Sequence, residues 1–130
     1  MNHRTDSSTS AASLYAQESI ENAPPVKIVR IMYQGAIRFL DSASACDPCA
    51  PASKFQHWLA RADEVVVELR LALEPGPAPE IARALSELYV FVEDAIRRAR
   101  LEQSVEPLAP ARTVLAKLLE SWTAIDTGKA

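Results

Sequence analysis

The most reactive side chains of this chain are two cysteines, Cys46 and Cys49, which stand in the order Cys-Asp-Pro-Cys. A Cys-x-x-Cys pair at the start of a helix lowers a thiol pKa and supports disulfide exchange. The βαβ pattern that surrounds such a pair in thioredoxin-like proteins is not found here. Zinc would need two further ligands, and only His57 lies nearby in sequence. A redox-responsive or metal-responsive module is kept as an alternative, and we predict no cofactor and no metal.

The densest positive charge is the cluster Arg97, Arg98 and Arg100. Cations near the C-terminal end of a helix complement its dipole, and three arginines on one turn are typical of a solvated face. The net charge of −3 does not provide the positive field on which nucleic-acid binding depends. The sequence shows no Glu-x-x-His pair, glycine-rich phosphate loop or Ser/His/Asp set. We therefore predict that the protein is not an enzyme and binds no nucleic acid.

The composition favours a single helical domain. A chain of 130 residues buries roughly two thirds of its unfolded surface, which is enough for one core. A hydrophobic content of 48% with only three glycines favours helices over a turn-rich β fold. No apolar run has the length of a signal peptide or a membrane span. We expect a cytoplasmic protein without membrane insertion.

The chain divides into four parts. Residues 1–13 are polar and rich in Ser and Thr, which predicts a disordered tail. Residues 14–24 form a short N-terminal cap segment before the first helix. Residues 25–125 carry the helical periodicity, and 126–130 are a C-terminal tail.

Four helices are predicted, at about 25–44, 52–74 and 80–102, with the fourth beginning near Pro110. Proline-containing linkers separate the first three, because proline removes a backbone donor and clashes with the preceding turn. Each helix carries an apolar stripe at the 3, 4 and 7 spacing. The predicted fold is therefore all-α, an antiparallel four-helix bundle with a short N-terminal cap segment.

The first helix carries two apolar stripes, although a helix on the outside of a bundle needs one. Its polar residues fall within a strip about 80° wide. The first stripe is Ile28, Ile31, Met32, Gly35 and Phe39, and the second is Val29, Tyr33, Ile37 and Leu40. Either the helix is central and buried by its own chain, or the second stripe stays uncovered and forms a groove for a partner. Val67, Leu71 and Val90, off the main stripes of the next two helices, add to the groove interpretation.

The segment before the first helix carries the apolar residues Leu14, Tyr15 and Ile20. These residues either form a displaceable cover over the groove or pack permanently as a hydrophobic staple. The sequence does not separate the two interpretations.

Residues 15–25 and 28–40 together resemble the opening of the FliS family, the flagellin-specific secretion chaperones of bacterial flagella. The positions that match without a gap are Tyr15, Ile20, Ala23, Pro25, Tyr33, Gly35, Arg38 and Phe39. Weaker likeness extends over about 14–125. Pro24 replaces a common Ser or Thr that would cap the first helix, Arg100 replaces an Asn, and the Cys-Asp-Pro-Cys linker is not a family feature.

The resemblance implies a cytosolic bundle that binds the otherwise disordered C-terminal region of flagellin and prevents premature polymerisation. It also implies delivery of flagellin to the type III export gate, through the cytoplasmic domain of FlhA when flagellin is bound. The segment around Tyr15 and Ile20 is similar to the family's cap over part of the groove. A homodimer is left open, as is a role in regulating a different flagellar protein through the same groove.

Helix-in-groove binding of a disordered segment is the recognition mode that fits these implications. The residues that we predict to line the flagellin-binding groove are Ile28, Ile31, Met32, Tyr33, Ile37, Leu40, Leu69, Leu88 and Tyr89. Each is also compatible with an ordinary core position, the last three most of all.

Overall fold

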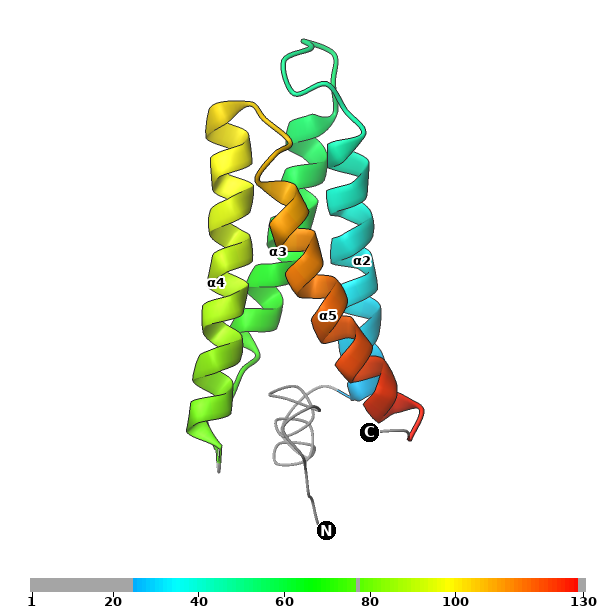
Figure 1. Ribbon diagram of the computed structural model, residues 1–130, viewed down its shortest axis with the longest axis vertical. Coiled ribbons are helices and arrows are strands. Elements are labelled where there is room, and N and C mark those ends of the chain that lie inside the picture. Colours follow the sequence, from blue (N-terminus) through cyan, green and yellow to red (C-terminus); the bar gives the residue numbers. More distant parts are fainter. Residues whose placement is uncertain (1–24, 77, 129–130) are drawn as a thin grey trace.

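The computed structural model describes residues 25–76 and 78–128, which form four α-helices. The helices are α2 (Val26–Ser44), α3 (Phe55–Leu71), α4 (Pro79–Glu102) and α5 (Leu108–Asp126). Successive helices run in opposite directions (Figure 1), and the described residues contain no β-strand. The predicted all-α class and helical bundle are confirmed. The predicted tail at 1–13 and cap segment at 14–24, with Tyr15 and Ile20, lie outside the described residues.

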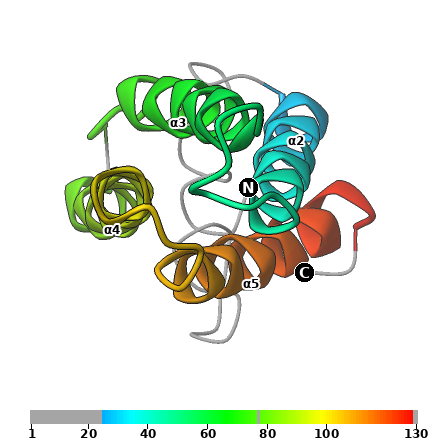
Figure 2. The ribbon, with the colours of Figure 1, turned by 90° about the horizontal axis from the view of Figure 1, so that it is seen from above.

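The helices form a ring in which each packs against its neighbours in sequence, and α5 closes the ring against α2. Viewed along the bundle, α2 and α4 lie on one diagonal and α3 and α5 on the other (Figure 2). The centre is filled by the apolar stripes of α3, α4 and α5, which bury large side chains completely. The fully buried residues from these stripes are Phe55, Leu59, Val66, Leu85, Val92, Ile96, Leu108 and Leu115.

The second stripe of α2 faces this core. Tyr33 and Leu40 are 0% and 1% exposed, and Val29 and Ile37 are also buried. The prediction that this stripe forms an open groove is wrong, because the neighbouring helices of the same chain cover it. On this point the alternative interpretation, a helix buried by its own bundle, is correct.

Two helices differ in length from the prediction. Helix α3 begins at Phe55 rather than 52, because successive turns occupy 47–53 and the Ser53 hydroxyl accepts the Phe55 N–H at 3.0 Å. It ends at Leu71 rather than 74. Pro75 follows shortly afterwards, and a proline disfavours helical geometry in the residue before it, here Glu74. Helix α5 begins at Leu108, so Pro110 is its third residue. Proline fits there because the first amides of a helix have no acceptor within it.

The bundle is open at one end. Helices α4 and α5 approach each other near the 103–107 connection and diverge toward the end where α3 stops and α4 begins (Figure 1). The Cys-Asp-Pro-Cys connection between α2 and α3 lies at the opposite end. We call these the open end and the closed end of the bundle. Since α3 stops at Leu71, apolar side chains near the start of α2 have less helix to cover them.

Candidate functional site

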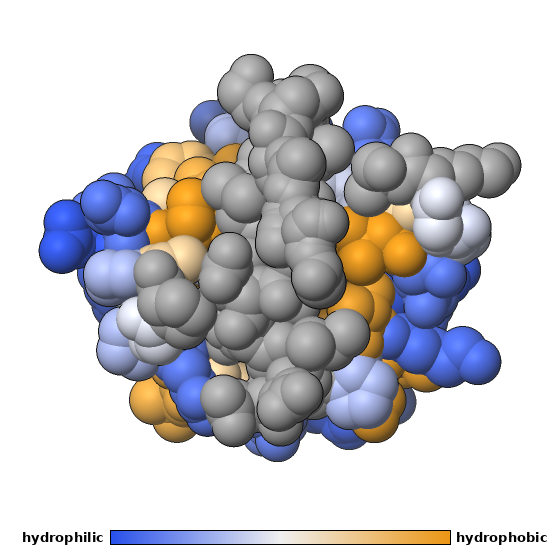
Figure 3. Space-filling model, turned by 90° about the horizontal axis from the view of Figure 1, so that it is seen from below, coloured by the Kyte–Doolittle hydropathy of each residue, from blue (hydrophilic) through white to orange (hydrophobic). Residues whose placement is uncertain are grey.

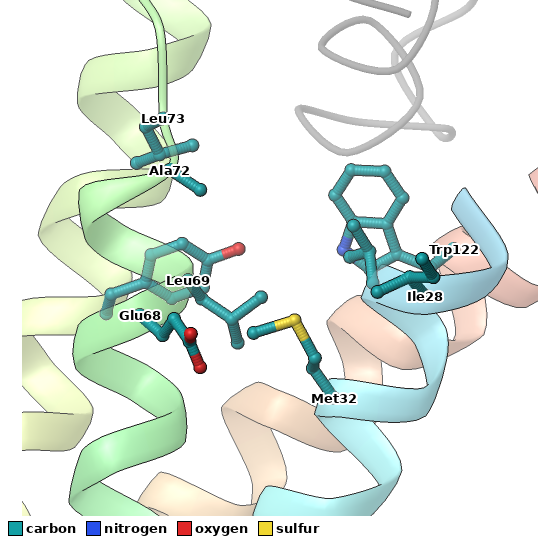
Figure 4. A pocket seen from close by; sticks show the side chains of 9 residues that line it. Ile28, Met32, Glu68, Leu69, Ala72, Leu73 and Trp122 are labelled. Atoms are coloured by element: carbon teal, nitrogen blue, oxygen red, sulfur yellow. The ribbon is translucent and has the colours of Figure 1, made fainter. Parts of the chain in front are cut away.

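A pocket of about 480 Å³ lies at the open end of the bundle. All four helices or their ends contribute to its wall (Figure 4). The lining residues are Ile28, Val29 and Met32 from α2, Glu68, Leu69, Ala72 and Leu73 from α3 and its end, Tyr89 from α4 and Trp122 from α5. Eight of these nine residues are apolar or aromatic, so the pocket suits an apolar side chain better than a charged or sugar-like ligand.

An aromatic cluster closes the inner side of this pocket. The Tyr33 and Tyr89 hydroxyl oxygens lie 2.5 Å apart in a buried hydrogen bond between α2 and α4. The Tyr33 ring centroid lies 6.2 Å from those of Tyr89 and Trp122. Burial raises the pKa of Tyr33 to about 12, although its hydrogen bond with Tyr89 opposes the shift. The hydrogen bond between the two hydroxyls therefore joins the diagonally opposite helices α2 and α4 through Tyr89, which also lines the pocket.

The rim of the pocket is unusually apolar for a protein surface. Ile28 is 47% exposed and borders the pocket, while Ile31, one turn further along α2, is 57% exposed. Leu71 at the end of α3 is 70% exposed. In the view onto this end, apolar surface lies beside the hydrophilic rim (Figure 3). Exposed large apolar side chains beside an apolar pocket are typical of an interaction site.

Ion pairs fix the helices that surround the pocket. The Arg30 guanidinium on α2 contacts the Asp126 carboxylate on α5 at 2.5 Å. Arg70 on α3 makes a two-pronged contact with Glu93 on α4, with Nε to Oε2 at 2.6 Å and Nη2 to Oε1 at 3.3 Å. Two-pronged arginine–carboxylate contacts add geometric definition as well as energy. These pairs hold neighbouring helices in register on two sides of the opening.

A second, shallower hollow of about 450 Å³ lies between α4 and α5. Its lining residues are Ala84, Glu87, Leu88 and Phe91 from α4 and Val114 from α5. Phe91 is 43% exposed and its neighbour Val90 is also exposed. Helix α4 thus presents apolar side chains outside the core as well as toward it.

The structure separates the nine residues predicted to line one groove into four groups. Ile28, Met32, Leu69 and Tyr89 meet at the pocket, although Leu69 and Tyr89 are otherwise core residues. Ile31 lies on the exposed surface of α2, and Leu88 lines the second hollow. Tyr33, Ile37 and Leu40 are core residues and lie on no open surface.

Several residues that line the pocket or the hollow were not among the predicted site residues, and three of them are informative. Trp122 follows Leu115 and Leu118 on the apolar stripe of the last helix and is buried, yet its indole also lines the pocket. Glu68 is one of the positions of weaker family likeness, but no role at the groove was predicted for it. Phe91 was detectable, because a phenylalanine off the main stripe of its helix is expected to be exposed.

The cysteine pair gains no support as a redox or metal site. Both thiols are free, and Cys46 Sγ donates to the Ser42 carbonyl oxygen at 3.4 Å. The pair follows the C-terminal end of α2, where the helix dipole is negative, whereas thiolates are stabilised at helix N-termini. Over residues 25–76 and 78–128, no cluster of three or more His, Cys, Asp or Glu could hold a metal ion.

Within the described part of the chain, no helix is both long and apolar enough to cross a bilayer.

Comparison with known proteins gives two matches. The family model described as "Flagellar protein FliS" matches residues 7–129. The "Flagellar secretion chaperone FliS" of Campylobacter jejuni subsp. jejuni serotype O:6 (strain 81116 / NCTC 11828) is 25% identical over 112 residues, covering 86% of this chain and 88% of that protein. FliS is a family of chaperones and not of enzymes, which confirms the prediction that the chain is not an enzyme. With a family match across nearly the whole sequence and a helical bundle of the expected class, this chain belongs to the FliS family.

Proposed function

We propose that this protein is a cytoplasmic export chaperone that binds the C-terminal region of flagellin through the pocket at the open end of its bundle. Membership of the FliS family supports a role in flagellar export, and the Campylobacter relative is named a flagellar secretion chaperone. The observation that carries the proposal is the apolar pocket with its exposed rim of Ile28 and Ile31.

The physical basis is coupled folding and binding. A disordered segment that becomes helical on docking loses several kcal/mol to ordering, so it needs apolar contacts to offset that cost. Burial of apolar surface contributes roughly 25 cal/mol per Å². Ile28, Ile31 and Met32 lie on one side of α2 and provide such surface without any change in the core. The hollow between α4 and α5 offers a second contact for a segment that follows the outside of the bundle.

Holding the C-terminal region would keep flagellin from polymerising in the cytosol. The loaded chaperone then helps to deliver flagellin to the type III export gate, with the cytoplasmic domain of FlhA as its partner there. Both steps follow from the family resemblance and are part of the proposal.

Titration of the full chain with the C-terminal fragment of its own organism's flagellin tests the proposal. Calorimetry should show binding with a negative heat-capacity change, the marker of buried apolar surface. Met32→Glu places a charge in the pocket and should weaken binding at least tenfold. Ser44→Glu introduces the same charge on the exposed last residue of α2, at the closed end, and should bind like the wild type. Equal affinity of the two variants would contradict the assignment of the pocket.

The alternative role, regulation of a different flagellar protein, uses the same surface. Capture of partners from the cytosol in the presence of excess flagellin C-terminal fragment separates the two roles. The chaperone role predicts that flagellin is the main partner and that the fragment displaces it.

A further inference from the structure

We propose that Glu68 determines specificity at the pocket by pairing with a lysine or arginine of the bound segment. The inference rests on the proposed function, since it names what the pocket selects in its partner. Glu68 is the one charged residue among the nine that line the pocket. Its carboxylate therefore distinguishes an otherwise apolar site from a general hydrophobic patch.

The position of the carboxylate supports this role. In Figure 4 the Glu68 side chain extends from α3 toward Met32 on α2, so it lies beside the space that an apolar side chain would fill. Glu68 is exposed in the free chain, where water solvates its charge. A docked helix would remove part of that water, which is unfavourable for a carboxylate that gains no partner.

Within residues 25–76 and 78–128, the chain supplies no such partner. Other charged residues of α3 have partners of their own: Arg61 pairs with Glu64 on the same helix, and Arg70 pairs with Glu93 on α4. Across the described residues, no cation pairs with the Glu68 carboxylate, and no side chain donates a hydrogen bond to it. Because the described part of the chain leaves this carboxylate without a cation, we expect the bound segment to provide one.

The expected ligand is thus an amphipathic helical segment with an apolar residue in the pocket and a basic residue about one turn away, because side chains three or four apart share a helix face. Segments with an acidic residue at that position are repelled. Specificity then arises from a penalty against wrong partners as well as from attraction to the right one.

Charge exchange at position 68 tests the inference in the full chain. Glu68→Lys should weaken binding of the flagellin C-terminal fragment about tenfold at low salt, and Glu68→Gln about threefold, with both losses shrinking as salt screens the charges. Glu64→Lys, one turn away on α3 and outside the pocket lining, is the matched control and should change the affinity less than twofold.

The partner residue is identified by changing each lysine and arginine of the fragment to glutamate in turn. One change should weaken binding to the wild type and restore binding to Glu68→Lys, the coupling that a direct contact produces. If no fragment variant shows this coupling, or if Glu68→Lys binds like Glu64→Lys, the inference is overturned while the proposed function stands. If the wild type itself does not bind the fragment, the proposed function fails.

Discussion

The two apolar stripes of α2 have similar composition and opposite surroundings. The second stripe, with Tyr33 and Leu40, is buried along its whole length, whereas the first is exposed at Ile28 and Ile31 and partly covered at Phe39. Phe39 is covered because its ring stacks on Trp58 at 5.8 Å and lies 5.1 Å below the Arg61 guanidinium. The first stripe therefore changes from packing surface to open surface along one helix. Both stripes are apolar enough to pack in a core or to bind a partner. The length of the neighbouring helices determines which part of each stripe is buried.

The largest effect is expected on the buried stripe. Leu40→Ala should lower the free energy of unfolding by about 2–5 kcal/mol, because it leaves a cavity in a packed core. Urea denaturation followed by circular dichroism measures the change. Leu71→Ala, at a side chain that is 70% exposed, is the control and should stay within about 0.5 kcal/mol of the wild type.

The buried hydroxyl of Tyr33 should make stability depend on alkaline pH. The folded pKa of about 12 exceeds the unfolded value, so the stabilisation is present below pH 10 and is lost as the pH rises from about 10 to 12. The loss should reach about 2–3 kcal/mol. The full loss is reached only above pH 12, so urea titrations at pH 9 and 11 should show about half of it, and Tyr33→Phe supplies the background from other groups. Parallel curves for the two proteins would contradict the burial of this hydroxyl.

Phe39 is the intermediate case on the first stripe. Phe39→Ala should cost about 1–2 kcal/mol of unfolding free energy, less than a full core truncation because the ring is only half-buried against Trp58. Thermal unfolding checks this value. A cost as large as that of Leu40→Ala would mean that this part of the stripe belongs to the core.

The smallest effect on stability is expected at Ile31. Ile31→Ser should change the unfolding free energy by no more than about 0.5 kcal/mol, since the side chain is mostly exposed. The same change should weaken flagellin binding several-fold, because an apolar contact on the rim is removed. Denaturation and calorimetry on one preparation measure both. Unaltered affinity would place Ile31 outside the interface.

Helix periodicity was sufficient to predict the helices and most of the core. The stripes of the later helices, such as Leu85, Val92 and Ile96 on α4, are buried as their spacing indicates. The same spacing did not reveal which stripe of α2 stays open, because both are equally apolar and the answer depends on where α3 ends. The contact between Tyr33 and Tyr89 joins residues 56 positions apart, a relation that no local pattern contains. Site prediction therefore failed where burial depends on tertiary packing.

The hydrogen bond between the Tyr33 and Tyr89 hydroxyls also affects how the entropic cost of binding is divided between the chaperone and the bound segment. This hydrogen bond between α2 and α4 is already formed in the free chaperone. The pocket at the open end therefore does not need to form when a segment binds. Most of the entropic loss then falls on the incoming chain. Segments with a stronger intrinsic tendency to be helical should consequently be held more tightly, even when their contacting side chains are identical.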